Sequence, residues 1–423
     1  MDVPHVPEAE APGPGFRGWW IAGGLGVTVA VAYGVLSYAF PVFIDPMSAE
    51  LGWSQATITG AFSLATLMAG LAAVPTGIAV DRIGPRAVMV SGTLMGTLAL
   101  VLWSQTASVG GFYLAAGLMG LAMATTFYEP AFAVAARWFS RFRGRALTVL
   151  TVVGGLSSII FVPLASLLVE VHGWRPTLLV LGGVLAGVTL PIHGLLTRNA
   201  PEEVGLGTDG DHLAPTLPSP SDAALPRDPP PTSPPAASRG SFAWLAASFG
   251  MSAAVSTAIA IHFIPLLLER GYSLPVAGTL MGVLGLMALP GRLLIAPRMD
   301  RRSAVGVSGG VLAMMGVGLL VLTALPNSVG IWSFIVLFGA GAGVLTPARG
   351  ALIAELYGSA SYGTLSGALA LPVALSRAAA PVGGSLLYAA SGDYRTVLLA
   401  LLALVGVSIL FLRKVDSRAG KSD

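Results

Sequence analysis

Long apolar segments alternate with short polar ones along almost the whole chain. Each apolar segment has about 20 residues or more, the length that an α-helix needs to cross the hydrocarbon core of a membrane. Because backbone N–H and C=O groups find no water there, such segments are predicted to be helices that satisfy their own hydrogen bonds. The predicted spans cover twelve ranges: residues 18–43, 55–80, 86–104, 110–138, 146–169, 174–198, 241–268, 275–298, 304–325, 329–357, 362–390 and 394–413.

One long polar segment interrupts this pattern near the middle of the chain. Residues 199–240 are rich in proline, which is typical of an extended or disordered tether. Six predicted spans precede this segment and six follow it. The predicted fold class is an all-α membrane protein with twelve transmembrane helices in two pseudo-symmetric six-helix bundles. The predicted units are a disordered N-terminal tail (1–16), a first bundle (17–198), the linker (199–240), a second bundle (241–413) and a C-terminal tail (414–423).

Short polar motifs of the first half recur in the second half. Leu51-Gly52-Trp53-Ser54 resembles Arg270-Gly271-Tyr272-Ser273, Asp81-Arg82 recurs as Asp300-Arg301, and Gly173-Trp174-Arg175 resembles Asp393-Tyr394-Arg395. The members of each pair are about 220 residues apart, which indicates an internal repeat. Parallel repeats related by an axis along the membrane normal place a substrate site at their interface, near the middle of the membrane.

The composition excludes several classes of protein. Charged residues make up 10% of the chain, whereas a soluble domain carries about 25%. The chain has no cysteine, so disulfides, thiolate metal sites and cysteine nucleophiles are absent. No His/Asp/Glu spacing suggests a metal site, and the glycine-rich segment 339–343 lacks the preceding strand and the lysine of a nucleotide-binding loop. Metals, other cofactors and ATP are therefore not expected.

The basic residues predict how the chain is oriented in the membrane. With a cytoplasmic N-terminus, the loops on the cytoplasmic side contain Arg82, Arg86, Arg137, Arg141, Arg143, Arg145, Arg298, Arg301, Arg302, Arg413 and Lys414. The loops on the opposite side contain Arg175, Arg270 and Arg395. This asymmetry predicts a multi-pass protein of the cytoplasmic membrane with both termini and the linker in the cytoplasm. The basic residues behind the net charge of +3 are then topology signals of a protein in a lipid bilayer. Nucleic acid is not an expected partner.

The loop between the second and third predicted spans carries a recognisable motif. Gly77, Asp81, Arg82, Gly84 and Arg86 resemble the signature loop of the major facilitator superfamily, with Pro85 in place of its first closing basic residue. The resemblance covers nearly the whole chain. It implies a transport protein, not an enzyme, that works by alternating access. Asp81 is expected to form a cytoplasmic ion-pair latch between helices at this gate; alternatively, the arginines of the loop only set the topology.

Four charged residues lie deep inside predicted spans, away from the helix ends, where a charge is costly and usually faces a cavity, a partner or a pathway. They are Glu129, Arg292, Arg349 and Arg377. Three guanidinium groups against one carboxylate favour an anionic substrate, because guanidinium grips a carboxylate through two parallel hydrogen bonds. Tyr128 is a further candidate for a hydrogen bond to the substrate. The alternative is that Glu129 pairs with an arginine as a structural bridge.

Two residues are candidates for coupling transport to protons. Burial raises the pKa of a carboxylate and a nearby arginine lowers it, so substrate binding to the arginine would free Glu129 to accept a proton. His262 would sense protons from outside, since histidine titrates near neutral pH. The alternative for His262 is a structural role, and the alternative to proton coupling is exchange with a counter-anion.

Two of the arginines carry a narrower resemblance. Arg292 is similar in position to the arginine with which monocarboxylate porters hold the substrate carboxylate, and Arg377 to a basic residue of the oxalate–formate antiporter. Two features depart from the porters: Ala288 replaces their acidic residue, and the first span has no lysine. The resemblance implies a secondary active transporter of a small organic anion, including monocarboxylates; the alternative for Arg292 is that it only holds the eighth span to a neighbouring helix.

Two other functions stay open. The first is proton-driven efflux of amphipathic drugs or metabolites. The Gly-Pro motif that drug–proton antiporters carry in the fifth span is absent here, because Gly154-Gly155 is followed by proline only at Pro163. The second is a receptor or sensor that uses the fold without transport, although the linker has no recognisable signalling domain.

Overall fold

The computed structural model describes residues 16–210, 239–291, 304–357 and 362–419. The first half contains α1 (Arg17–Tyr33), a π-helical turn η1 (Gly34–Tyr38), a 3-10 turn η2 (Phe40–Phe43), α2 (Ile44–Leu51), α3 (Gln55–Ile83), α4 (Pro85–Ser104), α5 (Val109–Thr126), α6 (Tyr128–Trp138), α7 (Arg143–Gly154), α8 (Ser157–His172), α9 (Trp174–Pro191) and η3 (Ile192–Leu196). The second half contains α10 (Arg239–Glu269), α11 (Leu274–Leu286), α12 (Ala288–Pro290), α13 (Ala304–Ala324), α14 (Ser328–Tyr357), α15 (Tyr362–Ser391) and α16 (Tyr394–Ala419).

The predicted all-helical membrane fold is confirmed. Ten helical segments of the described chain are long and apolar enough to cross a membrane. The shorter apolar segment Leu274–Pro290 and the 30-residue helix α15 occupy the two remaining predicted spans. The end of the eighth predicted span, residues 292–298, lies outside the described residues.

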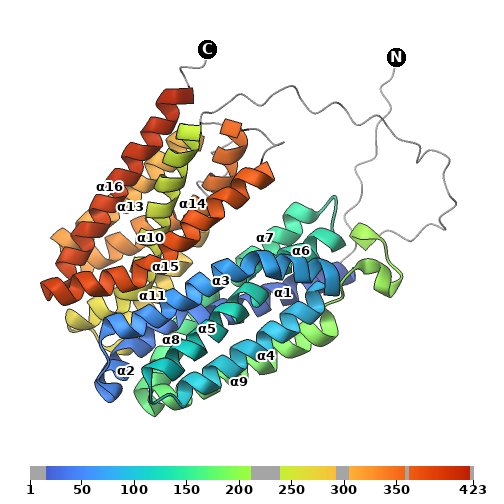
Figure 1. Ribbon diagram of the computed structural model, residues 1–423, viewed down its shortest axis with the longest axis horizontal. Helices are drawn as coiled ribbons and strands as arrows, with labels where there is room; N and C mark the ends of the chain where they lie inside the picture. The colour runs from blue at the N-terminus through green and yellow to red at the C-terminus, as the bar shows by residue number, and fades with distance from the viewer. Residues whose placement is uncertain (1–15, 211–238, 292–303, 358–361, 420–423) are drawn as a thin grey trace.

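The two halves of the chain form two bundles that lie side by side (Figure 1). The blue-to-green helices make one bundle and the yellow-to-red helices make the other, and they meet where α3 packs on α15 and α8 packs on α11. The α8–α11 contact is close because α11 presents glycine there: a Cβ on Gly282 would lie 3.1 Å from the Cα of Ile159. Small residues allow helix backbones to approach in this way within a membrane.

The two ends of the bundles differ. We call the end with the loops at Gly52, Gly173, Gly271 and Gly392 the far end, and there the bundles are in contact through Gln55 and Tyr394. We call the opposite end the linker end; for the first bundle it carries the loops at Gly84 and at residues 139–142. Figure 1 shows the bundles diverging from the far end, with α6 and α7 well separated from the C-terminal part of α16.

Several predicted spans are not continuous α-helices, among them the fourth, the fifth and the first. The fourth breaks at Phe127, which adopts an extended conformation (φ −78°, ψ −159°) between α5 and α6. The cause is Pro130, which has no N–H and whose ring would clash with the carbonyl of Thr126 in a regular helix. The fifth span turns at Gly154-Gly155 between α7 and α8, and the first passes through the π-helical turn after Tyr33.

The start of the predicted linker is a correction to the sequence-based interpretation. Residues 198–210, which we call the strap, fold onto the first bundle and include two 3-10 turns, Pro201–Val204 and Thr208–Gly210. Val204 and Leu206 pack against a buried cluster that also includes Phe16. The strap is ordered because it supplies apolar contacts and polar partners to the bundle, which the abundance of proline does not reveal. Residues 211–238 of the linker lie outside the described residues.

Candidate functional site

Aromatic rings meet at the point where α1 ends and α5 breaks. The ring of Tyr33 stacks on Phe127 with 3.6 Å between centroids, and lies 5.1 Å from Tyr128 and 6.0 Å from Tyr38. Tyr128 in turn stacks on Phe132 at 5.3 Å. We call these five residues the aromatic cluster. Its geometry depends on the two backbone irregularities, because the break at Phe127 and the π-helical turn bring rings from α1 and α6 together.

Two charges from different bundles lie within electrostatic range of Tyr33. The phenol of Tyr33 interacts electrostatically with Glu129 of the first bundle and with Arg377 of the second. The side chains of Glu129 and Arg377 are both exposed, whereas Tyr33 and Tyr128 are half-buried. Glu129 lies in the first turn of α6, where the helix dipole favours a carboxylate. Of the predicted site residues, Tyr128 and Glu129 are neighbours at the start of α6, and Glu129 and Arg377 both lie within electrostatic range of Tyr33.

The other two predicted arginines are placed differently. Arg349 is half-buried in α14 and has an interaction partner of its own. Arg292 lies outside the described residues. The aromatic partners Tyr33, Phe127 and Phe132 were not predicted, because aromatic residues are ordinary in membrane spans. The signal that points to them is Pro130, which predicts a helix break just beside Phe127.

His262 lies in a polar chain that crosses between the bundles at the far end. Its side chain is 3% exposed, and its Nε2 donates to the carbonyl oxygen of Pro381 at 2.9 Å. Its Nδ1 is 3.5 Å from the hydroxyl of Tyr394, which donates to Oε1 of Gln55 at 3.1 Å. The Nε2 of Gln55 then donates to Asp45 at 3.3 Å. A second link between the bundles joins the hydroxyls of Thr59 and Ser385 at 2.9 Å.

The signature loop lies at the linker end of the first bundle. Gly84 closes the turn between α3 and α4 with φ +87°, a conformation that favours glycine, and a Cβ there would collide with the side chain of Asn199. Asp81 pairs with Arg137 of α6 at 3.5 Å, so an ion pair between helices is present. Arg82 is exposed, and the backbone N–H of Arg86 donates to Asn199 at 3.1 Å. A Cβ added to Gly77 would meet no neighbouring atom within 4 Å.

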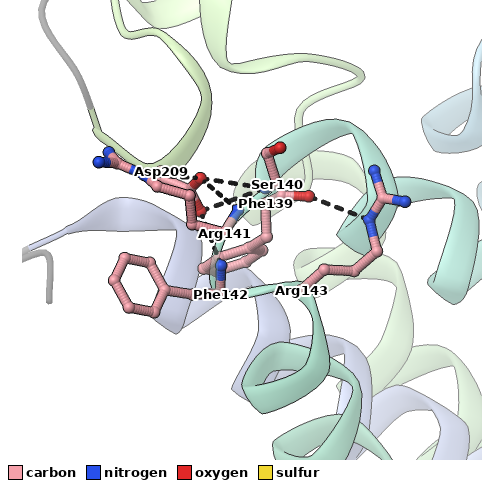
Figure 2. A network of polar contacts seen from close by, with 6 residues as sticks. All are labelled: Phe139, Ser140, Arg141, Phe142, Arg143 and Asp209. Carbon is pink, nitrogen blue, oxygen red and sulfur yellow. Dashed lines mark hydrogen bonds and ion pairs between the residues drawn. The ribbon is translucent and has the colours of Figure 1, made fainter. Parts of the chain in front are cut away.

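A buried carboxylate of the strap holds the loop between α6 and α7 (Figure 2). Asp209 accepts hydrogen bonds from the backbone N–H groups of Ser140 (3.2 Å), Arg141 (2.8 Å) and Phe142 (3.4 Å), and is 3% exposed. The Nε of Arg141 lies 3.6 Å from the same carboxylate. The strap thus supplies the side chain that satisfies the backbone donors just before α7. The only sequence signal for Asp209 is the turn dipeptide that it forms with Gly210.

The fold agrees with the comparison with known families. A model of the Major Facilitator Superfamily matches residues 25–381. The chain belongs to the Major Facilitator Superfamily. It is therefore a multi-pass membrane protein, and its relatives are transporters, not enzymes.

Curated relatives of this superfamily member are monocarboxylate transporters. The chain is 31% identical over 211 residues to monocarboxylate transporter 11 of Mus musculus (50% of this chain, 45% of the relative). It is 26% identical over 197 residues to monocarboxylate transporter 12 of Rattus norvegicus (46% and 40%), and 31% identical over 178 residues to monocarboxylate transporter 13 of Bos taurus (42% and 41%). The matched part therefore spans less than half the length of these relatives.

Solved structures share the fold over nearly the whole chain. A POT family transporter in complex with 5-aminolevulinic acid has a TM-score of 0.72 at 13% identity, covering 97% of this chain and 98% of that one. A bacterial homologue of the human lysosomal transporter Spinster has a TM-score of 0.71 at 14% identity, covering 95% and 96%. The human organic anion transporter MFSD10 has a TM-score of 0.63 at 17% identity, covering 95% and 100%.

Proposed function

We propose that this protein is a secondary active transporter that moves a small organic anion, in the first instance a monocarboxylate, across the cytoplasmic membrane by alternating access. The observation that carries the proposal is the shared neighbourhood of Glu129 and Arg377, which come from different bundles and both act on Tyr33. Exposed charges between the halves of a membrane protein are typical of a substrate pathway. The names of the curated relatives support a carboxylate.

In this proposal Arg377 binds the substrate carboxylate. Its planar guanidinium offers paired N–H donors that match the two oxygens of a carboxylate. Tyr128 adds a hydrogen bond from the first bundle, so the substrate bridges the two bundles. Arg292 and Arg349 are proposed to add positive potential along the path of the anion.

Glu129 is the proposed proton carrier. An ionised carboxylate close to Arg377 would repel an incoming anion, whereas its protonated form would not. Because the protonated carboxyl of Glu129 does not repel the anion, anion and proton are expected to bind together. Exchange of the substrate with a counter-anion is the alternative coupling, and it needs no proton on Glu129. His262 is proposed to respond to protons at the far end through its link to Tyr394.

The orientation of the protein follows from the positive-inside rule. The basic loops at residues 82–86 and 137–145 belong to the linker end, which we propose faces the cytoplasm with both termini. The bundles then touch on the outer side and diverge towards the cytoplasm, as expected for an inward-facing state. The signature loop 77–86 is proposed as part of the cytoplasmic gate.

The proposal is tested by uptake of labelled lactate into liposomes that contain the purified protein, corrected for protein-free liposomes. Wild type is expected to show uptake that saturates. Uptake by Arg377→Ala is expected to be at least about tenfold lower than that of wild type, since a charge-assisted bond to the substrate is lost. Arg395→Ala is the matched control, because Arg395 is exposed at the start of α16 at the far end. Equal uptake by wild type and Arg377→Ala would remove Arg377 from the substrate site.

The same liposomes test the coupling. Glu129→Gln is expected to abolish the stimulation of uptake by an inward proton gradient while it leaves exchange of internal for external substrate intact. A variant that still concentrates substrate in response to the gradient would exclude Glu129 as the proton carrier.

A second function is favoured by one specific observation. Exposed Glu129 beside half-buried Tyr33 and Tyr128 would also suit an amphipathic cation, because carboxylates and aromatic faces both attract cations. Thermal unfolding of the purified protein with carboxylates and with cationic drugs separates the two functions, since a ligand that binds the folded state stabilises it. Stabilisation by cationic drugs alone would favour efflux.

A further inference from the structure

The first bundle caps its helices differently at its two ends. At the far end the caps are local. The Oγ of Ser54 accepts the N–H of Thr57 in α3 at 3.1 Å. The Oγ of Ser108 accepts the N–H of Gly111 in α5 at 3.2 Å. At the linker end, α4 begins after Gly84, which has no side chain and cannot supply such an acceptor. The first donor of α4 therefore needs an acceptor from elsewhere in the chain.

Asn199 of the strap supplies that acceptor. The first residue of α4 is Pro85, which has no N–H, so the first donor of the helix belongs to Arg86. The N–H of Arg86 donates to Oδ1 of Asn199 at 3.1 Å, across 113 positions of sequence. Asparagine is among the residues most favoured at the N-cap of a helix. Asn199 thus does for α4 what Ser108 does for α5 from its own loop.

The missing side chain of Gly84 also makes room for this cap. A Cβ built on Gly84 would lie 2.5 Å from Oδ1 and 2.7 Å from Cγ of Asn199. Such a collision would push the amide of Asn199 away from Arg86. The positive φ of Gly84 and this close approach are two separate reasons for a glycine here. The second glycine of the signature loop is therefore the seat of a strap residue.

The strap holds the amide of Asn199 in one orientation. Its Nδ2 donates to Oε1 of Glu203 at 3.0 Å, and its backbone N–H donates to Oε2 of the same carboxylate at 3.4 Å. Because Nδ2 is bound to a carboxylate, Oδ1 is left to accept from Arg86. The preceding residue is fixed as well, since Nε1 of buried Trp138 donates to the carbonyl oxygen of Arg198 at 3.2 Å.

These contacts connect the two sides of the ion pair between Asp81 and Arg137. Asp81 lies three residues before Gly84, and Arg137 directly precedes Trp138 in α6. Strap residues 198 and 199 are thus bonded to α6 beside Arg137 and to the segment that follows Asp81. The ion pair itself is exposed and spans 3.5 Å, so it contributes little to this arrangement. The strap is what fixes the signature loop relative to α6.

We infer that Asn199 is a positioning residue of the proposed cytoplasmic gate, which caps α4 through the space left by Gly84 and holds the signature loop against α6. Loss of this cap frees the loop, so the gate spends less time in its working geometry. The inference rests on the role proposed for the signature loop in transport. The position of the loop is measured without transport, so the two can fail separately.

The test measures the mobility of the signature loop by electron paramagnetic resonance on the purified full chain. The spin label is placed at Ile83→Cys, because Ile83 is the last residue of α3, its side chain is 62% exposed and the chain has no other cysteine. In Asn199→Ala the population of mobile label is expected to rise about fivefold, as for the loss of a helix cap. In Asn199→Asp/Glu203→Gln the amide and the carboxylate change places. This double variant keeps an acceptor for Arg86, so the mobility is expected to return to the wild-type value.

Ser108→Ala is the matched control, because it removes a helix cap from the same bundle at the far end. It is expected to lower the unfolding temperature about as much as Asn199→Ala and to leave the label at Ile83 unchanged. Glu203→Ala is a milder change at an exposed residue. It frees the amide of Asn199 and is expected to raise the mobility of the label to a smaller extent. This variant decides the inference if Asn199→Ala does not fold.

Uptake of labelled lactate into liposomes extends the test to the gate. Asn199→Ala is expected to lower the maximal rate severalfold and to leave the half-saturating concentration within about twofold, because the substrate site is not touched. Unchanged mobility in Asn199→Ala and Glu203→Ala, or an equal change in Ser108→Ala, would overturn the inference. A mobile loop with the wild-type maximal rate would overturn it as well. Absence of saturable uptake by wild type would overturn the proposed function, while the label still decides whether Asn199 positions the loop.

Discussion

At the far end, side-chain hydrogen bonds join one bundle to the other, whereas at the linker end they join the first bundle to its own strap. Tyr394 to Gln55 (3.1 Å) and Thr59 to Ser385 (2.9 Å) are bonds of the first kind. Asp209 to the loop before α7 is a bond of the second kind. A movement of the two bundles must break the former and can leave the latter intact.

The chemistry of the two ends fits this difference. The far-end links are between neutral amides and hydroxyls, each with a net contribution of about 0.5–1.5 kcal/mol. The strap uses the carboxylate of Asp209, and bonds to charged groups contribute about 1.5–3 kcal/mol. The weaker bonds at the far end suit a gate that opens and closes. The stronger bonds of Asp209 suit a strap that moves with the first bundle as one rigid body.

The largest effect is expected for Asp209→Ala. It leaves three backbone donors of the loop before α7 without their acceptor, and the loss of hydrogen bonds to a charged group costs about 1.5–3 kcal/mol. We expect a lower unfolding temperature and faster cleavage by trypsin at Arg141, Arg143 and Arg145. Glu202→Ala is the control, because Glu202 is an exposed residue of the same strap. Equal trypsin sensitivity of the two variants would show that the strap does not hold this loop.

A smaller effect, of a different kind, is expected for Tyr394→Phe. The loss of its bond to Gln55 is expected to weaken the contact between the bundles at the far end by about 1 kcal/mol. The equilibrium then shifts roughly fivefold towards a state that is open at the far end. Because the chain has no cysteine, spin labels at Ala49→Cys and Ala390→Cys report the distance across the far end directly.

Tyr388→Phe controls for the loss of a tyrosine hydroxyl. The hydroxyl of Tyr388 hydrogen-bonds Glu269, and both residues belong to the second bundle. This variant is expected to leave the distance distribution unchanged. If both variants broaden it alike, the bond between Tyr394 and Gln55 is not part of a gate.

The smallest effect is expected for Asp81→Asn. The side chain of Asp81 is 82% exposed, and exposed ion pairs contribute about 0–1 kcal/mol. Arg137 also keeps its bond to the carbonyl of Val80 at 3.3 Å. The unfolding temperature is therefore expected to change by less than in Asp209→Ala. If Asp81→Asn lowered the unfolding temperature more than Asp209→Ala, the Asp81 ion pair would contribute more to stability than the Asp209 contacts, contrary to this account.

The fold could be predicted because its main determinant is local. The length of an apolar run fixes whether it spans a membrane, and this holds for each span without knowledge of the others. The interruptions of the membrane helices were harder to predict. Pro130 and Gly154-Gly155 are visible in the sequence, but membrane helices tolerate both residue types, so composition alone does not show which ones break the helix. The strap was missed because Asp209 finds its partners about 68 residues earlier in the chain.

The site could be predicted in part for a related reason. Glu129 and Arg377 are conspicuous because a charge within a span is costly, whatever the fold. Tyr33 and Phe127 have no such signature, since their role depends on neighbours that only the folded chain provides. The same applies to His262, whose partners Pro381 and Tyr394 are more than 100 residues away in sequence.

The central claim is that Arg377 binds the carboxylate of the substrate, and direct binding tests it most simply. Calorimetric titration of the purified full chain with lactate is to be compared for wild type, Arg377→Lys, Arg377→Ala and Arg395→Ala. We expect the dissociation constant to rise at least about tenfold in Arg377→Ala, less in Arg377→Lys, which keeps the charge without the paired donors, and not in Arg395→Ala. An affinity of Arg377→Ala equal to that of wild type would contradict the account.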